Sequence, residues 1–151
     1  MKVLCIYPDT SVVGGCFDEE FTLKSRALFS MVGRGGAVPV ISDILVNELA
    51  PSPPRVRSLL SGLPRQAVEL VFADDESEYL RDAYLRAGAV GPRQHQDAHH
   101  IALATVARAD LLVSWNFKHI VRYDKIRVFN AVNLKEGYPP IDIRSPVEVV
   151  P

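Results

Sequence analysis

The chain has few cysteines, almost no net charge and a single tryptophan, and the first two of these narrow the classes of protein it can be. Its 151 residues include only Cys5 and Cys16, which do not form a Cys-x-x-Cys pair. We therefore expect no disulfide framework, and we expect Cys5 to be a buried thiol within an apolar run. The formal net charge of −1 argues against a histone-like nucleic-acid binder, although a local basic patch stays open.

Long apolar segments are also missing, and this bears on the cellular compartment. No stretch is long enough to span a bilayer, and the N-terminus lacks a charged region followed by a small-residue cleavage site. We therefore expect a cytoplasmic protein that does not bind membranes. The 48% hydrophobic and 23% charged content is that of an ordinary globular protein. The length suits one compact domain that covers residues 1–151.

Short apolar runs alternate with helical patterns along the chain, and this alternation predicts the fold class. Helices are expected at 18–33, 43–50, 54–60, 75–88 and 93–108. Strands are expected at 1–7, 38–42, 67–72, 110–113 and 126–129, with a turn at 9–11 and an extended surface strand or arm at 138–151. The prediction is an α/β fold, namely a three-layer α/β/α sandwich on a mostly parallel sheet.

Three acidic residues and one amide occupy positions that a parallel sheet would bring to one edge. Asp9 and Asn116 each follow an apolar strand, and Glu48 and Asp97 lie on expected helices. Each alone has an ordinary explanation, such as a turn or cap for Asp9, a solvated helix face for Glu48, a helix start for Asp97 and a turn for Asn116. Their joint placement is what predicts a site.

Converging carboxylates repel one another unless a cation lies between them, so these residues predict a metal site. Oxygen ligands select hard cations, which favours Mg²⁺ or Mn²⁺ over Zn²⁺. Two such ions ~4 Å apart would activate a water molecule and stabilise the attacking and leaving oxygens of a phosphodiester.

The sequence resembles the PIN-domain family, which includes the ribonuclease toxins of type II toxin–antitoxin pairs (VapC-like proteins). The resemblance covers nearly the whole chain. The segments that carry it are 7–11, the helix with Glu48, 96–105, 112–120, 129–138 and 143–149. It implies a PIN-like fold and a metal-dependent endonuclease specific for single-stranded RNA.

Position by position, the resemblance implies that Asp9, Glu48 and Asp97 are acidic metal ligands and catalytic residues. Thr10 or Ser11 would support the first of them. An antitoxin partner and a homodimer are also implied by the resemblance alone.

Asn116 departs from the pattern, because many members of the family carry a fourth aspartate there. An amide oxygen can coordinate a cation or hold a metal-bound water, but it brings no charge. Three consequences of this departure are compatible with the sequence, namely catalysis with one metal ion, weak activity, or a changed substrate. The alternative function is a PIN-like module that has weakened catalysis and acts by binding RNA or protein.

A cationic stretch beside Asn116 is a candidate RNA contact. It contains Lys118, His119, Arg122, Lys125 and Arg127, and such residues can hold phosphates. An ordinary solvated face explains it equally well.

The histidines and glycines suggest other sites only weakly. His95 and His99 have the i,i+4 spacing of two Zn²⁺ ligands, but no third ligand follows. We expect His100 to be a surface or capping histidine, and the alternative is that it orients Asp97 or contacts a phosphate. Trp115 could stack a base, although an aromatic residue at the end of a buried strand usually belongs to the core. Gly14-Gly15 does not form a dinucleotide fingerprint, so a Rossmann-type nucleotide site has little support.

Overall fold

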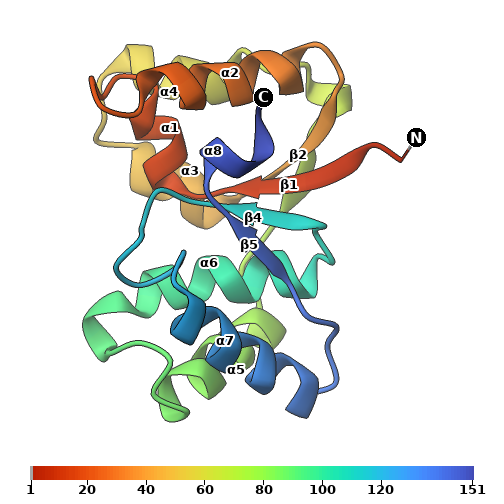
Figure 1. Cartoon of the computed structure of the whole chain (residues 1–151). Helices are drawn as coiled ribbons and strands as arrows, with labels where there is room; N and C mark the ends of the chain where they lie inside the picture. Colours follow the sequence, from red (N-terminus) through yellow and green to blue (C-terminus); the bar gives the residue numbers. More distant parts are fainter. Residues whose placement is uncertain (1) are drawn as a thin grey trace.

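A sheet of five parallel strands forms the centre of the molecule, as seen in a computed structural model that describes residues 2–151 (Figure 1). The strand order is β3-β2-β1-β4-β5, so β1 is central and β3 and β5 are the edges. The strands are β1 (Leu4–Pro8), β2 (Ala37–Ser42), β3 (Glu69–Val71), β4 (Leu111–Val113) and β5 (Asp142–Arg144). Because all the pairings are parallel, the carboxyl ends of the strands meet at one edge.

Helices cover both faces of the sheet, which confirms the three-layer prediction. Figure 1 shows α1, α2, α3, α4 and α8 on one side and α5, α6 and α7 on the other. Their bounds are α1 (Thr10–Gly15), α2 (Thr22–Gly33), α3 (Asp43–Leu49), α4 (Pro54–Ser61), α5 (Asp75–Arg86), α6 (His95–Val106), α7 (Tyr123–Lys135) and α8 (Pro146–Val149). Two short 3₁₀ turns, η1 (Arg65–Ala67) and η2 (Pro92–Gln94), precede β3 and α6. No helix within residues 2–151 is both long and apolar enough to cross a bilayer.

Each face of the sheet has its own hydrophobic core, because successive strand residues point to opposite faces. Ile6 packs into the core beneath α1 and α2, whereas the next residue, Tyr7, packs into the core with α5 and α6. The predicted burial of the helix around Ala98 is confirmed, because every residue of α6 from 98 to 105 is buried. This helix fills the space between the sheet and α5, and it carries Asp97 at its start.

The predicted strand at 126–129 is wrong, since these residues lie within α7. A short apolar run does not distinguish a strand from a buried helical segment. Here Phe129, Val132 and Asn133 are the buried residues, at the i, i+3, i+4 spacing of one helix face. The helical spacing of the buried residues over 129–133, and not the apolar run 126–129 alone, indicates the helix.

The prediction for 138–151 as an extended surface strand or arm is right only in part, because Asp142–Arg144 forms the edge strand β5 whereas Pro146–Val149 forms a helix. Ile143 is only 4% exposed, and β5 pairs with β4 as the edge of the sheet. The chain then enters α8, with Pro146 at its first position, where a missing N–H costs nothing. The expected turn at 9–11 is instead the start of α1, because Asp9 is the N-cap of that helix.

Gly15, at the end of α1, packs against Trp115 and Ser25. This packing predicts that alanine substitutions at Gly15 and at its neighbour Gly14 differ strongly in their effect on stability. A Cβ at Gly15 would lie 2.5 Å from Ser25 Oγ and 2.9 Å from Trp115 Nε1, which hydrogen-bond each other at 2.7 Å. We expect Gly15→Ala to lower the free energy of unfolding by about 1–3 kcal/mol through overpacking. Gly14→Ala meets no atom within 4 Å and should leave stability unchanged or raise it by up to about 1 kcal/mol. Urea denaturation measures both variants, and equal stability of the two would contradict this view of the packing.

Candidate functional site

Asp9 stands at the carboxyl end of β1, and the protein holds its carboxylate from several sides. Its backbone N–H donates to Val113 O of β4 at 3.1 Å. Its side chain caps α1 by accepting from Val12 N at 3.3 Å, and the hydroxyls of Ser11 and Ser114 each donate to it at 2.5 Å. Burial raises the pKa of Asp9, which is 4% exposed, and the two serine hydrogen bonds oppose that shift.

Asp97 and Asn116 meet between α6 and the loop that follows β4. Asn116 Nδ2 donates to Asp97 Oδ2 at 3.2 Å, while Asn116 Oδ1 accepts from His119 N at 2.9 Å. Asn116 N also donates to Ser114 Oγ at 2.9 Å, and Ser114 is the residue that holds Asp9. The amide of Asn116 therefore presents its nitrogen to Asp97 and its oxygen to the backbone of its own loop.

Glu48 lies in the last turn of α3 and pairs with a histidine from the opposite layer. His100 Nε2 donates to Glu48 Oε1, and Thr10 Oγ1 donates to the same oxygen at 2.9 Å. Burial works to raise the pKa of Glu48, but the hydrogen bond and charge of His100, together with the hydrogen bond of Thr10, outweigh it and lower the pKa. His100 is 2% exposed, so the expectation of a surface or capping histidine is wrong.

The second nitrogen of His100 continues this contact into the core. Tyr7 Oη lies 2.6 Å from His100 Nδ1 and 2.7 Å from Ser42 Oγ, and Ser42 Oγ accepts from Leu45 N at 3.1 Å to cap α3. A carboxylate only accepts, so Nε2 carries a proton toward Glu48. In the neutral ring Nδ1 then accepts from Tyr7, and Tyr7 accepts from Ser42. The chain of hydrogen bonds joins the start of α3 to the glutamate at its end.

This chain predicts that the buried hydroxyl of Tyr7 contributes to stability. Tyr7→Phe removes the partner of His100 Nδ1 and one partner of Ser42 at a position that is 0% exposed. Because buried groups without partners are costly, we expect the free energy of unfolding to fall by about 1–3 kcal/mol. Tyr79→Phe is the matched control, since Tyr79 is 58% exposed and its removal should change little. Equal urea midpoints for the two variants would rule out this role for Tyr7.

Asp97 lies within range of the negative charges of Asp9 and Glu48. Burial is the largest cause that raises the pKa of Asp97, and the negative charges of Asp9 and Glu48 raise it further. The charges of His100 and His119 act in the opposite direction. Asp97 is therefore placed where additional negative charge is unfavourable.

The chemistry of this donor set fits a hard cation, because carboxylate and hydroxyl oxygens dominate it. The geometry is more open than a formed metal site. Within residues 2–151, no three His, Cys, Asp or Glu side chains lie close enough together to hold a metal ion. Glu48 and Asp97 each have a protein donor as their nearest polar partner. Binding of a cation would therefore require these carboxylates to exchange their present partners and come closer together.

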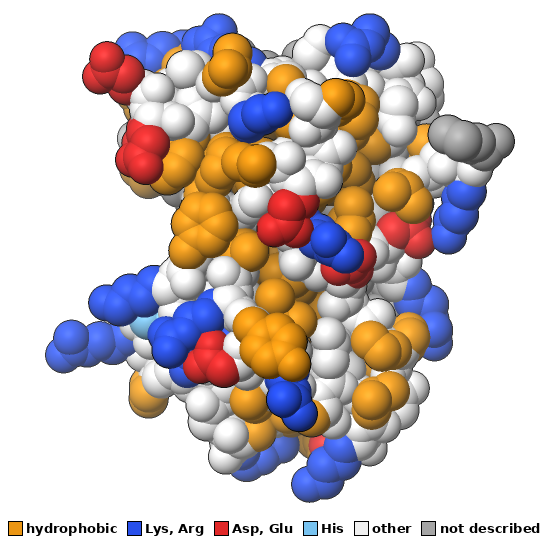
Figure 2. Space-filling view, in the orientation of Figure 1, with side chains coloured by type: hydrophobic (Ala, Val, Ile, Leu, Met, Phe, Trp, Pro, Cys, Tyr) orange, Lys and Arg blue, Asp and Glu red, His pale blue; other side chains and the backbone are white. Residues whose placement is uncertain are grey.

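Of the predicted RNA-contacting residues, Lys118, His119 and Arg122 lie on the loop that leads from Asn116 to α7, whereas Lys125 and Arg127 lie within α7. His119 is half-buried and lies near enough to Asp97 to lower its pKa, whereas Lys118 and Arg122 are exposed. The guanidinium of Arg122 already pairs with Asp124 at 2.8 Å. Figure 2 shows an indentation on the left of the molecule with Lys and Arg side chains gathered below it.

Two other candidates are not assembled as sites. His95 is exposed and bonds to Pro92 O, while His99 is buried and bonds to Ser77 Oγ at 3.1 Å, so the two rings are held by different partners. Trp115 is 8% exposed and stacks on Phe21 at 4.4 Å between ring centroids. Its ring belongs to the core, as expected for an aromatic residue at the end of a buried strand.

The sequence gives no sign that Tyr7 and Ser42 belong to this network. Tyr7 falls within the predicted strand at 1–7 and Ser42 within the one at 38–42, whereas Ser114 follows the predicted strand at 110–113. Only Ser114 had a usable clue, since a serine between β4 and Asn116 reaches the same edge of the sheet as Asp9.

Comparisons with known proteins give a likeness of fold. No family model and no curated protein sequence matches the chain. A chain in the structure of VapBC2 from Rickettsia felis, bound to a DNA fragment from their promoter, superposes with a TM-score of 0.58 at 13% identity, over 94% of this chain and 98% of that one. A chain in DNA-bound VapBC from Salmonella typhimurium gives a TM-score of 0.56 at 19% identity, over 95% and 99% of the two chains. The protein therefore has a PIN-like fold, of the kind found in VapBC complexes.

Proposed function

We propose that this chain is a metal-dependent endoribonuclease that cuts single-stranded RNA and acts as the toxin of a toxin–antitoxin pair. The observation that supports the proposal is a hydrogen-bond network at the carboxyl edge of a PIN-like sheet. Ser114 contacts both Asp9 and Asn116, Asn116 contacts Asp97, and Thr10, next to Asp9, contacts Glu48. The negative charges of Asp9 and Glu48 already raise the pKa of Asp97, so a cation near these residues would be favourable.

In this proposal Asp9, Glu48 and Asp97 hold Mg²⁺ or Mn²⁺. The bound cation would neutralise charge on the phosphodiester and activate water. The chain itself contributes positioning. Ser11 and Ser114 fix the carboxylate of Asp9, and Thr10 supports Glu48 together with His100.

Asn116 is the fourth residue of the proposed catalytic set. It orients Asp97 through its side-chain nitrogen. We propose that Lys118, His119 and Arg122 contact RNA phosphates, because they follow Asn116 closely in the sequence and supply cationic side chains.

The partner assignment is supported by the neighbours, which are VapBC complexes. We infer an antitoxin protein as the partner of this chain. A homodimer is the expectation that follows from the family resemblance.

A second candidate function is a PIN-like binding module without catalysis. Two features favour it. Asn116 supplies no negative charge at the fourth position, and Glu48 is already paired with His100. Such a protein would bind RNA or protein but would not cut RNA.

Cleavage of a 5′-labelled single-stranded RNA, compared with the same RNA as a duplex, tests the proposal. We expect Mg²⁺ or Mn²⁺ to support cleavage of the single strand and EDTA to abolish it. RNA binding without cleavage in either metal would favour the binding module. Cleavage that continues undiminished in EDTA would reject the metal-dependent mechanism.

A further inference from the structure

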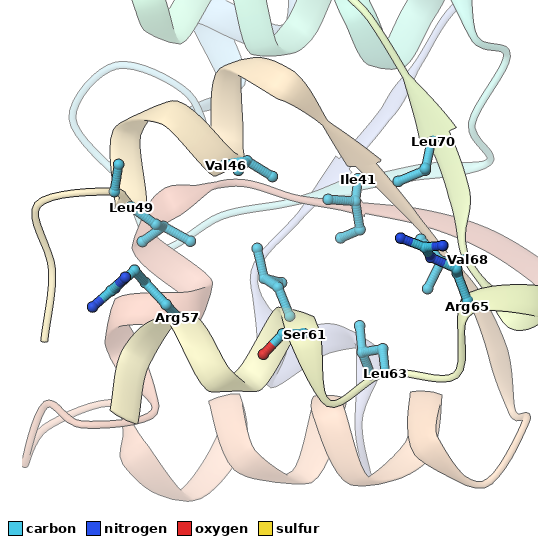
Figure 3. Close-up of a pocket in the computed structure, with 11 residues that line it drawn as sticks. Ile41, Val46, Leu49, Arg57, Ser61, Leu63, Arg65, Val68 and Leu70 are labelled. Carbon is cyan, nitrogen blue, oxygen red and sulfur yellow. The ribbon is translucent and has the colours of Figure 1, made fainter. Parts of the chain in front are cut away.

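An apolar groove lies between α3, α4 and the edge of the sheet, on the same layer as α1 and α2 (Figure 3). We call it the α3–α4 groove. It encloses about 670 Å³, and its floor includes Ile41 and Leu49, which are 4% and 3% exposed. Leu60 and Val68 line its sides, and Leu70, on the edge strand β3, is 58% exposed. Buried and exposed aliphatic side chains thus form one continuous apolar surface that is open to solvent.

Two arginines line the groove, and no acidic residue is among the residues that line it. Residues 51–68 contain three arginines and no aspartate or glutamate. Figure 3 shows two of them, Arg57 and Arg65, at opposite ends of the groove. Within residues 2–151 neither forms an ion pair, although Arg57 Nε donates to Ser52 O at 3.1 Å. An occupant with carboxylates near each end would therefore find two guanidinium groups available for charge-assisted hydrogen bonds.

We propose that the α3–α4 groove binds a segment of a partner protein that has apolar side chains in its middle and acidic side chains toward its ends. The aliphatic floor would take the apolar anchors, and Arg57 and Arg65 would take the carboxylates. The proposal does not depend on RNA cleavage, since it rests on the shape and charge of the groove alone.

The same features disfavour the other occupants. A second copy docked symmetrically would place the arginine-rich segment 51–68 against itself, which is repulsive. Single-stranded RNA needs aromatic platforms for its bases, and no aromatic residue lines the groove. A peptide with apolar and acidic side chains matches both the aliphatic lining of the groove and its two arginines.

Selection from a random 12-residue phage-displayed peptide library against the full chain tests the proposal. Enriched peptides should carry at least two apolar residues flanked by Asp or Glu. Their affinity, measured by fluorescence anisotropy, should fall at least tenfold in the double variant Arg57→Glu/Arg65→Glu and in Leu60→Glu. The matched control is Arg93→Glu, an exposed arginine outside the groove, which should bind the peptides as well as the wild type does.

Peptides that bind the wild type and the double arginine variant equally would overturn the proposal, as would enrichment that shows no acidic preference. Binding of a labelled oligouridylate that is lost in the double variant would assign the groove to nucleic acid instead. A dimer that dissociates in Leu60→Glu, seen by analytical ultracentrifugation, would assign it to a second copy. Both arginines are exposed, so the double variant provides the test even if Leu60→Glu fails to fold, and circular dichroism checks the fold of each.

Discussion

Asp97→Asn is expected to lower metal-dependent RNA cleavage by at least about 100-fold while it raises the thermal stability of the metal-free protein. The two effects have one cause. Burial and the charges of Asp9 and Glu48 raise the pKa of Asp97, so its ionised form is disfavoured in the folded state. Asparagine removes the charge and can still accept from Asn116 through its side-chain oxygen. The site would thus lose a ligand and the fold would lose a repulsion.

Asp97 is a better test position than Asp9. Replacement of Asp9 by alanine would remove the cap of α1 and leave the hydroxyls of Ser11 and Ser114 without their acceptor. The free energy of unfolding would fall by about 1–2 kcal/mol or more. A loss of activity could then come either from the missing carboxylate or from unfolding.

Asp82→Asn is the control for this experiment, because Asp82 lies on α5 in a surface pair with Arg81. It should cleave RNA as the wild type does and show little change in melting temperature. Full cleavage by Asp97→Asn would remove Asp97 from the catalytic set. A lower melting temperature in the metal-free variant would contradict the electrostatic argument.

Asn116→Asp is expected to strengthen Mn²⁺ binding by at least about tenfold and to destabilise the metal-free protein by about 1–2 kcal/mol. The new carboxylate would replace a donor that now lies 3.2 Å from Asp97 Oδ2, so an attractive contact becomes a repulsive one. Its other oxygen can still accept from His119 N. A cation that relieves the repulsion would bind more tightly and would stabilise the fold by mass action.

The matched control is Gln66→Glu, the same change from amide to carboxylate at an exposed residue of η1, which precedes β3, whereas the site lies at the carboxyl ends of the strands. It should alter neither Mn²⁺ affinity nor stability. Isothermal titration calorimetry and thermal melts with and without Mn²⁺ measure both variants. If Asn116→Asp bound Mn²⁺ no better than the wild type, the fourth position would not belong to the cation site.

Much of the fold could be predicted because several of its elements have strong local signals. The apolar run before Asp9 is the central strand β1, and the apolar sequence after Asp97 is the buried helix α6. Asp74 forms a capping box with Ser77 at the start of α5. Gly88 follows the end of this helix and has a φ of 75°, a backbone conformation that glycine adopts easily and that commonly ends helices. The helical state of residues 126–129 and 146–149 could not be predicted, because such short patterns suit more than one environment. Only tertiary packing decides between those environments.

The site could be predicted only as a neighbourhood. Strand ends and helix starts indicate that Asp9, Glu48, Asp97 and Asn116 gather at one edge, since parallel strands deliver their ends together. The partners of each side chain depend on packing in three dimensions. The pairing of Glu48 with His100, the buried hydroxyl of Tyr7 behind it and the reversed amide of Asn116 were therefore not accessible from spacing along the chain.

The central claim is that carboxylates distant in sequence form one binding region for a hard cation. The most direct test is isothermal titration calorimetry, in which Mn²⁺ is titrated into the purified, metal-free wild-type chain and, in a parallel experiment, into the Asp97→Asn variant. The account predicts saturable binding by the wild type and at least about tenfold weaker binding by the variant. Equal binding by both proteins, or none by the wild type up to millimolar Mn²⁺, would contradict it.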